Sequence, residues 1–397
     1  MLKTSERLNR LSESATLKMA KLSQQLAEKG VDVISLSVGQ PDFSTPKHIK
    51  EAAKKAIDGK FDGYSPVSGY LDLRKAVCEK LKRDSGLDYT PDQIVISTGA
   101  KQSLSNVFQC FLDEGDEVII PAPYWVSYPE QVGLCKATPV FIETNVESNF
   151  KITPEQLEAA ITPKTKFLVY SSPCNPTGSV YSKEEFAALA KVLEQHPHVY
   201  VVSDEIYEHI NYIGKHTSIA QAPNMKDRTI IVNGQAKGYA MPGWRIGYIA
   251  APKFIADACA KLQGQVTSGT NTIAQKATIE ALLGDQTPSV EMREAFKRRR
   301  DLVLSMLKEI PDVVCNVPDG AFYVFPDFSA YYGRTYQGEE IKNGEELCMF
   351  LLNVGHVAIV AGSSFGTPEC VRFSYAASDD TLIEALRRVK EALKQLD

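Results

Sequence analysis

Lys237 and Arg245 stand eight residues apart in the segment 233–245, NGQAKGYAMPGWR, between apolar runs at 230–232 and 246–250. The segment holds three glycines, two alanines and one proline, which are too small or too rigid to build a core. A lysine amine can act as a nucleophile or a base, and an arginine guanidinium binds carboxylates and phosphates. The segment is therefore either a flexible surface loop with two solvated cations or the reactive part of a ligand site.

Small residues follow the apolar run at 94–96, where Gly99 and Ala100 precede Lys101 at the start of a helical pattern. In open α/β sheets ligands bind beyond the carboxyl ends of the strands, so the residues after each run are candidates. Free backbone N–H groups at the start of a helix can hold an anion. Taken alone, the segment is better explained as a tight turn with a helix cap.

Trp125 and Asn175 follow two further apolar runs, at 118–120 and 167–170. The indole could be a core residue or a platform for a flat ring. The amide lies in a proline-rich stretch, SSPCNPTG, which could be a plain turn or could project Asn175 from the strand end.

Ser203 and Asp204 follow the apolar run at 199–202, and Tyr207 comes three residues after Asp204. A carboxylate at the end of a buried strand is costly unless it is paired with a donor or a cation. Asp204 could cap a following helix, or it could hold a protonated ring nitrogen. If Asp204 holds a ring nitrogen, the nearby phenol of Tyr207 could donate a hydrogen bond to the same ligand.

Together these groups match the needs of pyridoxal phosphate. Its aldehyde bonds to a lysine amine, and its pyridine nitrogen stays protonated beside a carboxylate. Its phenolate oxygen accepts hydrogen bonds, its flat ring stacks on an aromatic side chain, and its phosphate needs a cation and backbone N–H groups. The residues after the strands supply each of these groups.

The elements that must position these residues are short, continuous apolar runs separated by stretches that can hold helices. Continuous runs are typical of strands covered on both faces. The pattern predicts an α/β protein with a mostly parallel central sheet and helices on both faces. The predicted strands of this domain, placed within residues 47–290, are 94–96, 118–120, 140–142, 167–170, 199–202, 230–232 and 246–250.

A smaller α/β domain is expected from the N-terminal segment 1–46 and the C-terminal segment 291–397. A long charged helix at 289–310 would connect it to the large domain, and its basic cluster at 297–300 is interpreted as a solvated helix face. Other elements predicted here are helices at 16–29 and from Thr381, and strands at 33–38, 321–325, 357–360 and 371–374.

Composition excludes several classes of function. The 397 residues carry a formal net charge of −5, which gives no basic field for nucleic acid or anionic lipid. No apolar run approaches membrane-spanning length, and the N-terminus lacks the apolar core of a signal peptide. The eight scattered cysteines form no CxxC pair, so neither a metal site nor a disulfide framework is expected. We therefore expect a cytoplasmic protein without a metal.

The motifs above resemble the class I aminotransferases of the fold-type I pyridoxal-phosphate superfamily. The resemblance is closest to the prokaryotic-type (subgroup Ib) aspartate aminotransferases and runs from about Ser14 to the C-terminus. The matching stretches are SVGQPDF (37–43), GYSPVSGYLDLR (63–74), STGAKQ (97–102), APYWVSYPE (122–130), SSPCNPTGSVY (171–181), SDEIYEH (203–209), NGQAKGYAMPGWRIGY (233–248), GAFYVF (320–325), GSSFG (362–366) and VRFSYA (371–376).

The resemblance implies roles around the cofactor ring. Lys237 would bond covalently to the cofactor aldehyde and later carry the proton between the substrate α-carbon and the cofactor. Asp204 would pair with the pyridinium nitrogen. Tyr207 and Asn175 would donate to the phenolic oxygen, and Trp125 would stack on the ring.

The resemblance also implies how the phosphate is held. Gly99, Ala100 and Arg245 would bind it, and Tyr64 would reach it from the partner subunit. A homodimer with shared active sites follows from this implied role of Tyr64.

For the substrate, the resemblance implies that Arg372 grips the α-carboxylate as a bidentate fork, with help from Asn175 and the backbone of Gly39. Trp125 also borders the substrate. Lys101 is associated in this subgroup with the distal carboxylate of aspartate or glutamate. It could equally be a phosphate ligand or a solvated helix residue.

Two positions depart from the common pattern of the family. Ala236 stands where many relatives have a serine that helps to bind phosphate, and Pro242 replaces the threonine of AMTGWR. Neither change removes a charged group, so they bear on the finer phosphate contacts. Ser14 and Thr16 lie in the matching N-terminal segment.

The implied activity is transfer of the amino group of L-aspartate to 2-oxoglutarate, giving oxaloacetate and L-glutamate by a ping-pong mechanism. Aromatic acids, prephenate or other acceptors remain alternatives, as does a C–S lyase on the same fold. A nicotinamide-linked dehydrogenase would need a G-x-G-x-x-G motif, which is absent. A regulator would need a DNA-binding module, for which the segment before residue 14 leaves no room.

Overall fold

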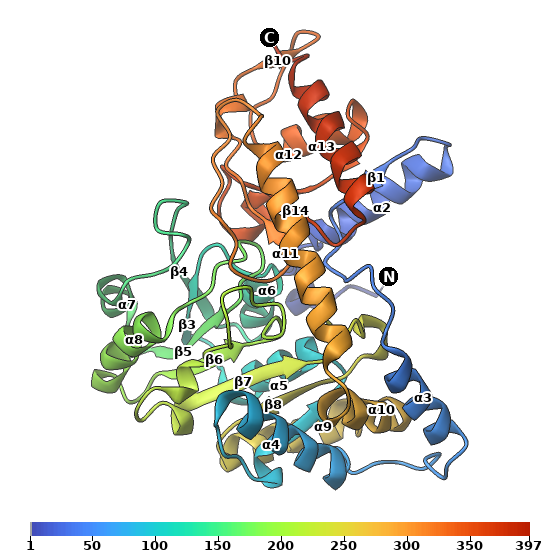
Figure 1. Ribbon diagram of the computed structural model, residues 1–397. Coiled ribbons are helices and arrows are strands. Elements are labelled where there is room, and N and C mark those ends of the chain that lie inside the picture. The colour runs from blue at the N-terminus through green and yellow to red at the C-terminus, as the bar shows by residue number, and fades with distance from the viewer. Residues whose placement is uncertain (1) are drawn as a thin grey trace.

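The computed structural model describes residues 2–397, and within them seven strands form one large sheet (Figure 1). Their bounds are β2 (Ile94–Ser97), β3 (Glu117–Pro121), β4 (Thr138–Ile142), β5 (Thr165–Ser171), β6 (Tyr200–Asp204), β7 (Thr229–Gly234) and β8 (Gly247–Ala250). They lie in the order β2-β8-β7-β6-β5-β3-β4. All run parallel except β8, which is antiparallel to both of its neighbours.

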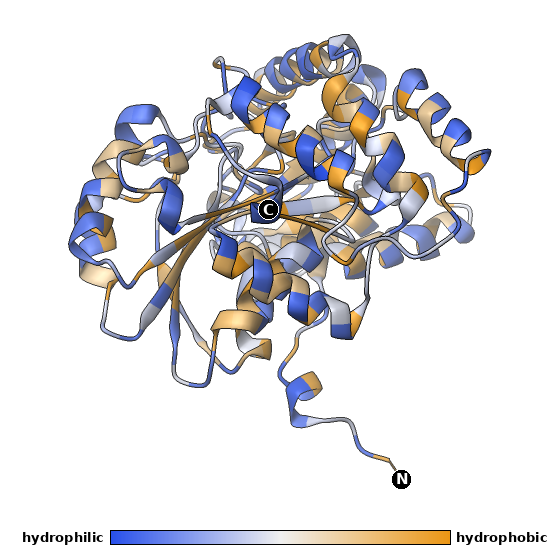
Figure 2. Ribbon diagram, turned by 90° about the horizontal axis from the view of Figure 1, so that it is seen from below, coloured by the Kyte–Doolittle hydropathy of each residue, from blue (hydrophilic) through white to orange (hydrophobic). Residues whose placement is uncertain are grey.

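Helices cover both faces of this sheet. One face packs against α5 (Ala100–Phe111), α6 (Ser127–Leu134) and α9 (Lys253–Val266). The other face packs against α4 (Leu71–Ser85), α7 (Pro154–Ala160), α8 (Lys183–Gln195) and α10 (Thr272–Leu283). Successive strand residues serve opposite faces, since Val95 belongs to the first core and Ile94 and Ile96 to the second. Figure 2 shows the apolar strands enclosed by helices whose polar sides point outward.

The predicted α/β class, with its mostly parallel central sheet, is confirmed by this arrangement. Each predicted strand of the large sheet is present within one or two residues of the expected position. Because both faces are buried, every position in these strands favours an apolar residue, and this is why the runs are continuous in the sequence.

A second, smaller body combines a segment from the N-terminal part of the chain with the C-terminal part. Its elements are α2 (Ala15–Glu28), β1 (Ile34–Ser35), β9 (Tyr323–Val324), β10 (Thr335–Tyr336), β11 (Glu339–Glu340), α12 (Gly344–Asn353), β12 (Val357–Ala358), β13 (Val360–Ala361), β14 (Val371–Ser374) and α13 (Asp379–Leu393). β1 pairs with β12, so the N-terminal segment joins the C-terminal one. α11 (Thr287–Leu307) runs between the two bodies (Figure 1). The remaining helices are α1 (Glu6–Asn9) and α3 (Lys47–Ile57).

Three strands predicted for the smaller body are shorter than expected. The run at 33–38 is ordered as a strand only at Ile34–Ser35, because the Ser37 carbonyl accepts a side-chain hydrogen bond instead of joining a ladder. The run at 321–325 is a strand only at Tyr323–Val324. The run at 357–360 divides at Ile359 into β12 and β13, which pair with different strands.

The interpretation of residues 297–300 as a solvated face is wrong for two of the four. Arg299 and Arg300 are buried, with exposures of 7% and 9%, while Arg298 is exposed. A helix turns about 100° per residue, so four consecutive residues cannot share one face. The cluster therefore points both outward and into the contact between the two bodies.

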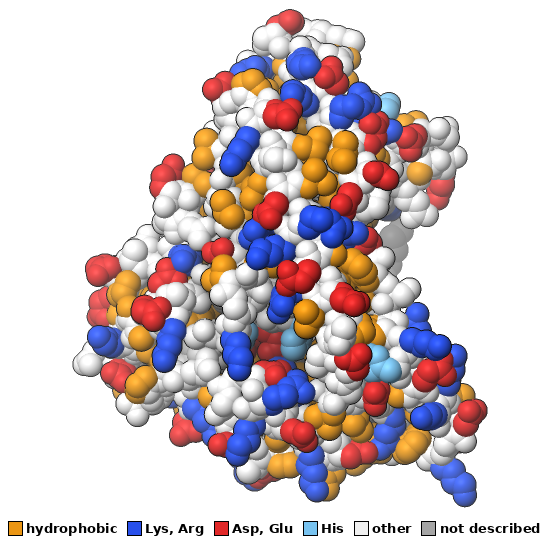
Figure 3. Space-filling model, viewed as in Figure 1, with side chains coloured by type: hydrophobic (Ala, Val, Ile, Leu, Met, Phe, Trp, Pro, Cys, Tyr) orange, Lys and Arg blue, Asp and Glu red, His pale blue; other side chains and the backbone are white. Residues whose placement is uncertain are grey.

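None of the helices within residues 2–397 combines the length and the apolar character needed to cross a bilayer. On the face drawn in Figure 3, acidic and basic side chains are interspersed.

Candidate active site

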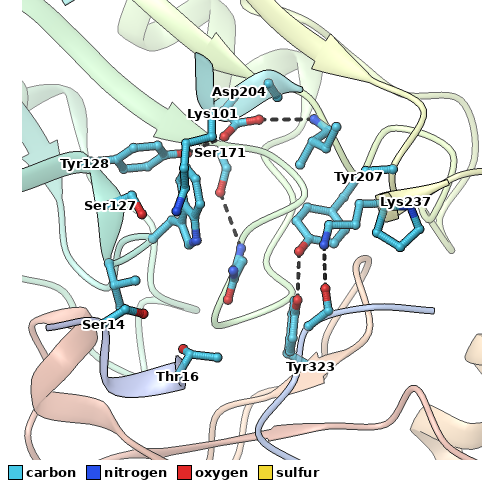
Figure 4. A pocket seen from close by; sticks show the side chains of 18 of the residues that line it. Ser14, Thr16, Lys101, Ser127, Tyr128, Ser171, Asp204, Tyr207, Lys237 and Tyr323 are labelled. Carbon is cyan, nitrogen blue, oxygen red and sulfur yellow. Dashed lines mark hydrogen bonds between the residues drawn. The ribbon is translucent and has the colours of Figure 1, made fainter. Parts of the chain in front are cut away.

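Lys237 lies in the turn that follows β7. A Cβ on the neighbouring Gly238 would stand 2.7 Å from the side chain of His209, so this turn requires glycine. The Lys237 amine donates to the carbonyl oxygen of Gly39 (Figure 4). Burial, and next the charge of Arg372, lowers the pKa of Lys237 to about 8. About a tenth of this amine is therefore neutral at pH 7, and the neutral form is the one that attacks an aldehyde.

Asp204 is the last residue of β6 and is 4% exposed. The Tyr128 hydroxyl donates to its Oδ2 at 2.8 Å, and the backbone N–H of Ile206 donates to Oδ1 at 3.3 Å. Burial raises the pKa of Asp204 to about 6, although these hydrogen bonds oppose the rise. A cation beside this carboxylate would remove the cost of its burial.

Two phenols and an amide lie beside Lys237. The hydroxyls of Tyr207 and Tyr323 share a hydrogen bond of 2.8 Å (Figure 4), and both residues are buried. The Lys237 Nζ lies 5.7 Å from the Tyr207 ring centroid. Asn175 lies just beyond the end of β5, and its backbone N–H donates to the Ser171 hydroxyl at 3.3 Å.

Arg372 projects from β14 and is 2% exposed. Its Nη1 donates to Asn175 Oδ1 at 2.9 Å, and its Nη2 donates to the Ser37 carbonyl at 2.6 Å. The guanidinium carbon lies 4.6 Å from the Tyr323 ring centroid and 4.9 Å from that of Phe365. The Nε–H is buried without a partner. A buried cation with an unused donor is prepared for an anionic ligand.

An anion cradle is present at the N-terminus of α5. Gly99 has φ of 85° and precedes a helix whose first N–H groups have no side-chain cap. A Cβ on Gly99 would stand 2.4 Å from Nη2 of Arg245, so only glycine lets that guanidinium approach. A Cβ on Gly247 would come within 2.2 Å of the Ala100 nitrogen. Backbone donors and a cation therefore converge on one point.

Lys101 and Trp125 form another wall of the site. The Lys101 Nζ lies 4.9 Å from the Trp125 ring centroid. Burial, and next the charge of Arg245, lowers the pKa of Lys101. Ser14 and Thr16, from the N-terminal segment, line the same space (Figure 4).

These walls enclose a cavity of about 350 Å³, a volume typical of small-molecule sites. Tyr64 does not reach it and is 99% exposed, and Gly99 lies just behind Arg245. The other predicted site residues all line the cavity: Gly39, Ala100, Lys101, Trp125, Asn175, Asp204, Tyr207, Lys237, Arg245 and Arg372.

Sequence patterns missed several side chains in the site. Tyr128 follows Trp125 by three residues, and this helical spacing was the available signal for their shared location. Tyr323 gave no signal, because an aromatic residue in the run GAFYVF is indistinguishable from core. Ser171 and Ser127 also line the cavity.

The residues present fit pyridoxal phosphate. Asp204 is a buried carboxylate whose hydrogen-bond partners are neutral, as a site for a protonated ring nitrogen requires. The uncapped α5 terminus and Arg245 suit a phosphate. Lys237 supplies an amine with a depressed pKa between these two points.

The cofactor-free protein is expected to carry one unusually reactive lysine. At mildly alkaline pH an amine-directed acylating reagent should modify Lys237 with half-maximal rate near pH 8, while exposed lysines need a pH near the ordinary value of about 10.4. Peptide mass spectrometry across a pH series measures this directly. A Lys237 profile that follows the exposed lysines would contradict the assigned environment.

Known proteins are similar to this chain in sequence and in fold. A family model described as aminotransferase class I and II matches residues 31–389. The chain is 48% identical over 389 residues to the aspartate/prephenate aminotransferase of Cereibacter sphaeroides, covering 97% of each chain. It is 46% identical over 396 residues to the aspartate aminotransferase of Bacillus subtilis, covering 99% of this chain and 100% of the other. The solved aspartate aminotransferase of Rhizobium meliloti matches with a TM-score of 0.97 and 43% identity, covering 100% of both chains.

Proposed function

Because the chain belongs to the class I and II aminotransferase family, we propose that it transfers the amino group of L-aspartate to 2-oxoglutarate, giving oxaloacetate and L-glutamate. It is a pyridoxal-phosphate-dependent transaminase. The relatives from Cereibacter sphaeroides and Bacillus subtilis support aspartate as the donor, since both have aspartate in their names. The ping-pong order follows from a single cavity that must serve donor and acceptor in turn.

The observation that carries this proposal is the state of Arg372. Its guanidinium is buried and partnered by Asn175 and Ser37, yet its Nε–H has no acceptor. Lys237 lies close enough for the Arg372 charge to lower its pKa. An amino acid held here by its α-carboxylate presents its α-carbon to the lysine amine.

The cofactor groups have matching residues in the site. Asp204 would hold the proton on the ring nitrogen, and Tyr207 and Asn175 would donate to the phenolic oxygen. Trp125 would stack on the ring. Gly99, Ala100 and Arg245 would hold the phosphate, and Lys101 lies near Arg245. Ala236 and Pro242 also line the cavity, and neither departure removes a charged group from the residues that would bind the phosphate.

Lys237 has two tasks. In the resting enzyme it would be the residue that holds the cofactor covalently. When bound, the cofactor supplies an electron-withdrawing ring that makes the substrate α-proton acidic. The Lys237 Nζ would take that proton as a general base, and burial, followed by the positive charge of Arg372, lowers its pKa and so favours the neutral form that this role requires.

The distal carboxylate of the substrate is assigned to Lys101. Its ammonium lies over Trp125 on the cavity wall, and the pKa of Lys101 is lowered by burial and by Arg245, so an added anion would be stabilised there. A single lysine at a pocket wall is a weak specificity code. Prephenate as an alternative acceptor is favoured by the name of the Cereibacter sphaeroides relative.

The absorption spectrum of the purified holoenzyme tests the proposal. The band of the bound cofactor should fade on addition of L-aspartate and return with 2-oxoglutarate, and a parallel sample receives prephenate in place of 2-oxoglutarate. A band that ignores aspartate but responds to another amino acid overturns the proposed donor. A protein that shows no band after incubation with pyridoxal phosphate is not a transaminase.

Arg372→Lys should raise KM for both substrates and lower kcat/KM by about 10²-fold or more, because lysine cannot form the two-pronged contact with a carboxylate. Steady-state kinetics with L-aspartate and with 2-oxoglutarate measure the effect. The control is Arg387→Lys, since Arg387 is 58% exposed on α13. Equal kinetics for the two variants would show that Arg372 does not bind substrate.

Three further assignments belong to this proposal. We infer a homodimer, because Tyr64 lies fully exposed on the surface and matches the family position that reaches the neighbouring site. We infer a cytoplasmic location, supported by eight free cysteines within residues 2–397. We place the domain boundaries at 46/47 and 290/291, since one apolar core gathers side chains from α2 and from residues 292–396.

A further inference from the structure

The segment 37–45, which we call the strap, connects β1 to the start of α3 and passes over the active site. The Ser37 carbonyl accepts a hydrogen bond from Arg372, and the Gly39 carbonyl accepts one from Lys237. The strap has no regular secondary structure of its own. Its position is therefore set by contacts to other elements.

One such contact is an ion pair with α11, in which Arg299 is buried and the Asp42 side chain is 29% exposed. The Arg299 guanidinium donates to both oxygens of Asp42, with Nη1–Oδ1 at 2.8 Å and Nη2–Oδ2 at 2.9 Å. Asp42 is the one charged residue of the strap. Arg299 is 7% exposed, and its Nε also donates to Asp379 Oδ1 at 3.3 Å. A two-pronged pair with one buried partner is more directional than a pair between two exposed side chains.

Aromatic contacts fix the same ion pair. The Arg299 guanidinium carbon lies 5.1 Å from the ring centroid of Phe43, in the strap, and 5.7 Å from that of Phe296, one helical turn earlier on α11. The two rings meet edge to face at 5.5 Å. Arg299 therefore binds the strap at two adjacent residues, which fixes its direction as well as its distance.

The far end of the strap is tied to the lysine turn. The Thr45 hydroxyl donates to the Ala240 carbonyl at 2.7 Å, and the indole N–H of Trp244 donates to the Thr45 hydroxyl at 3.0 Å. The Arg299 contact at Asp42 lies between this end and the two active-site carbonyls. Movement at Asp42 is therefore passed on to Gly39, three residues away.

We propose that Arg299 is a positioning residue that holds the strap so that the Ser37 and Gly39 carbonyls meet Arg372 and Lys237. The inference rests on the proposed function, because it assigns Arg299 to substrate binding in the same site. Arg299 touches neither substrate nor cofactor and acts through Asp42. Its loss loosens the segment that orients the carboxylate-binding arginine.

The test compares Arg299→Met, which keeps the length of the side chain, with Arg298→Met. Arg298 is the matched control, because it binds the same Asp379 at 3.1 Å but is 63% exposed and contacts no strap residue. In the holoenzyme, Arg299→Met should raise KM for L-aspartate and 2-oxoglutarate about tenfold with less than a threefold change in kcat. Arg298→Met should behave as the wild type.

A second measurement does not depend on turnover. Hydrogen exchange of the backbone in residues 37–45, measured by mass spectrometry on the purified protein, should rise in Arg299→Met but not in Arg298→Met, and exchange in β5 and β6 should stay unchanged. Asp42→Asn should cause the same rise in hydrogen exchange of residues 37–45. The double variant Arg299→Met/Asp42→Asn should exchange no faster than either single variant, since both substitutions remove the same contact. Arg299→Lys should fall between wild type and Arg299→Met.

Two results would overturn the inference. One is unchanged strap exchange and KM in Arg299→Met and Asp42→Asn. The other is additive effects of the two substitutions, which would mean that they act through separate contacts. If the wild type itself fails to transaminate, the proposed function falls while strap exchange still decides the role of Arg299. If Arg299→Met does not fold, Asp42→Asn and Arg299→Lys supply the same comparison.

Discussion

Lys237→Ala is expected to lower kcat by at least about 10⁴-fold, because it removes a covalent attachment and a general base together. The structure leaves no substitute nearby. The other cations of the cavity are Lys101, over Trp125, and Arg245 and Arg372, whose guanidinium groups are too weakly acidic to lose a proton. Substrate binding should persist in the variant, since the Arg372 contacts to Asn175 and Ser37 do not involve Lys237.

Single-turnover spectroscopy of the reconstituted variant with L-aspartate measures this loss. Lys183→Ala is the control, because Lys183 is exposed at the start of α8. The variant must still bind pyridoxal phosphate at the Arg245 end of the cavity, which equilibrium dialysis checks. A residual rate within about tenfold of the wild type would show that another group moves the α-proton.

Asp204→Asn is expected to lower kcat/KM by about 10³-fold, since a neutral amide cannot keep a proton on the ring nitrogen. The asparagine still accepts the hydrogen bond from Tyr128, so the local geometry is kept. Steady-state kinetics measure the effect, and Asp257→Asn is the control at a site that is 61% exposed. Wild-type activity in Asp204→Asn would remove Asp204 from the mechanism.

The same substitution should stabilise the cofactor-free protein above pH 6. Burial raises the pKa of Asp204 from 3.8 to about 6, so between these values the folded chain binds more protons than the unfolded chain. Stability therefore falls as pH rises through this window, and a penalty of about 3 kcal/mol remains above it. Denaturant unfolding at pH 8 should show Asp204→Asn to be more stable than the wild type, with the difference disappearing near pH 4.

The large sheet could be predicted from the sequence because one physical condition fixes it. Strands buried on both faces need apolar residues at every position, and the runs around Val95 and Val202 show this without ambiguity. The functional residues lie just beyond these runs, so position made Asp204 and Asn175 candidates, and only the combined set of groups pointed to a cofactor. The resemblance to a family then supplied roles for Lys237 and Arg372 that spacing could not.

What could not be predicted depends on contacts between distant segments. The basic run at 297–300 indicated a solvent-exposed position for Arg299. The run itself does not reveal that Asp42, distant in the sequence, pairs with this arginine. The strand predicted at 33–38 includes Ser37 and Val38, since the apolar run does not reveal that the Ser37 carbonyl faces a side chain. Tyr128 was not named as a site residue, because its hydroxyl partner, Asp204, lies 76 residues away.

The hydrogen bond between Arg372 and the Ser37 carbonyl joins residues 335 positions apart. Contacts at such separation form late, because a long loop must close before they contribute. A chain emerging from the ribosome folds its earlier parts first, so the strands that carry Asp204 and Lys237 are made well before Arg372. The nascent protein thus contains the residues that hold a cofactor before it contains Arg372, which binds the amino acid. It can turn over substrate only when synthesis is nearly complete.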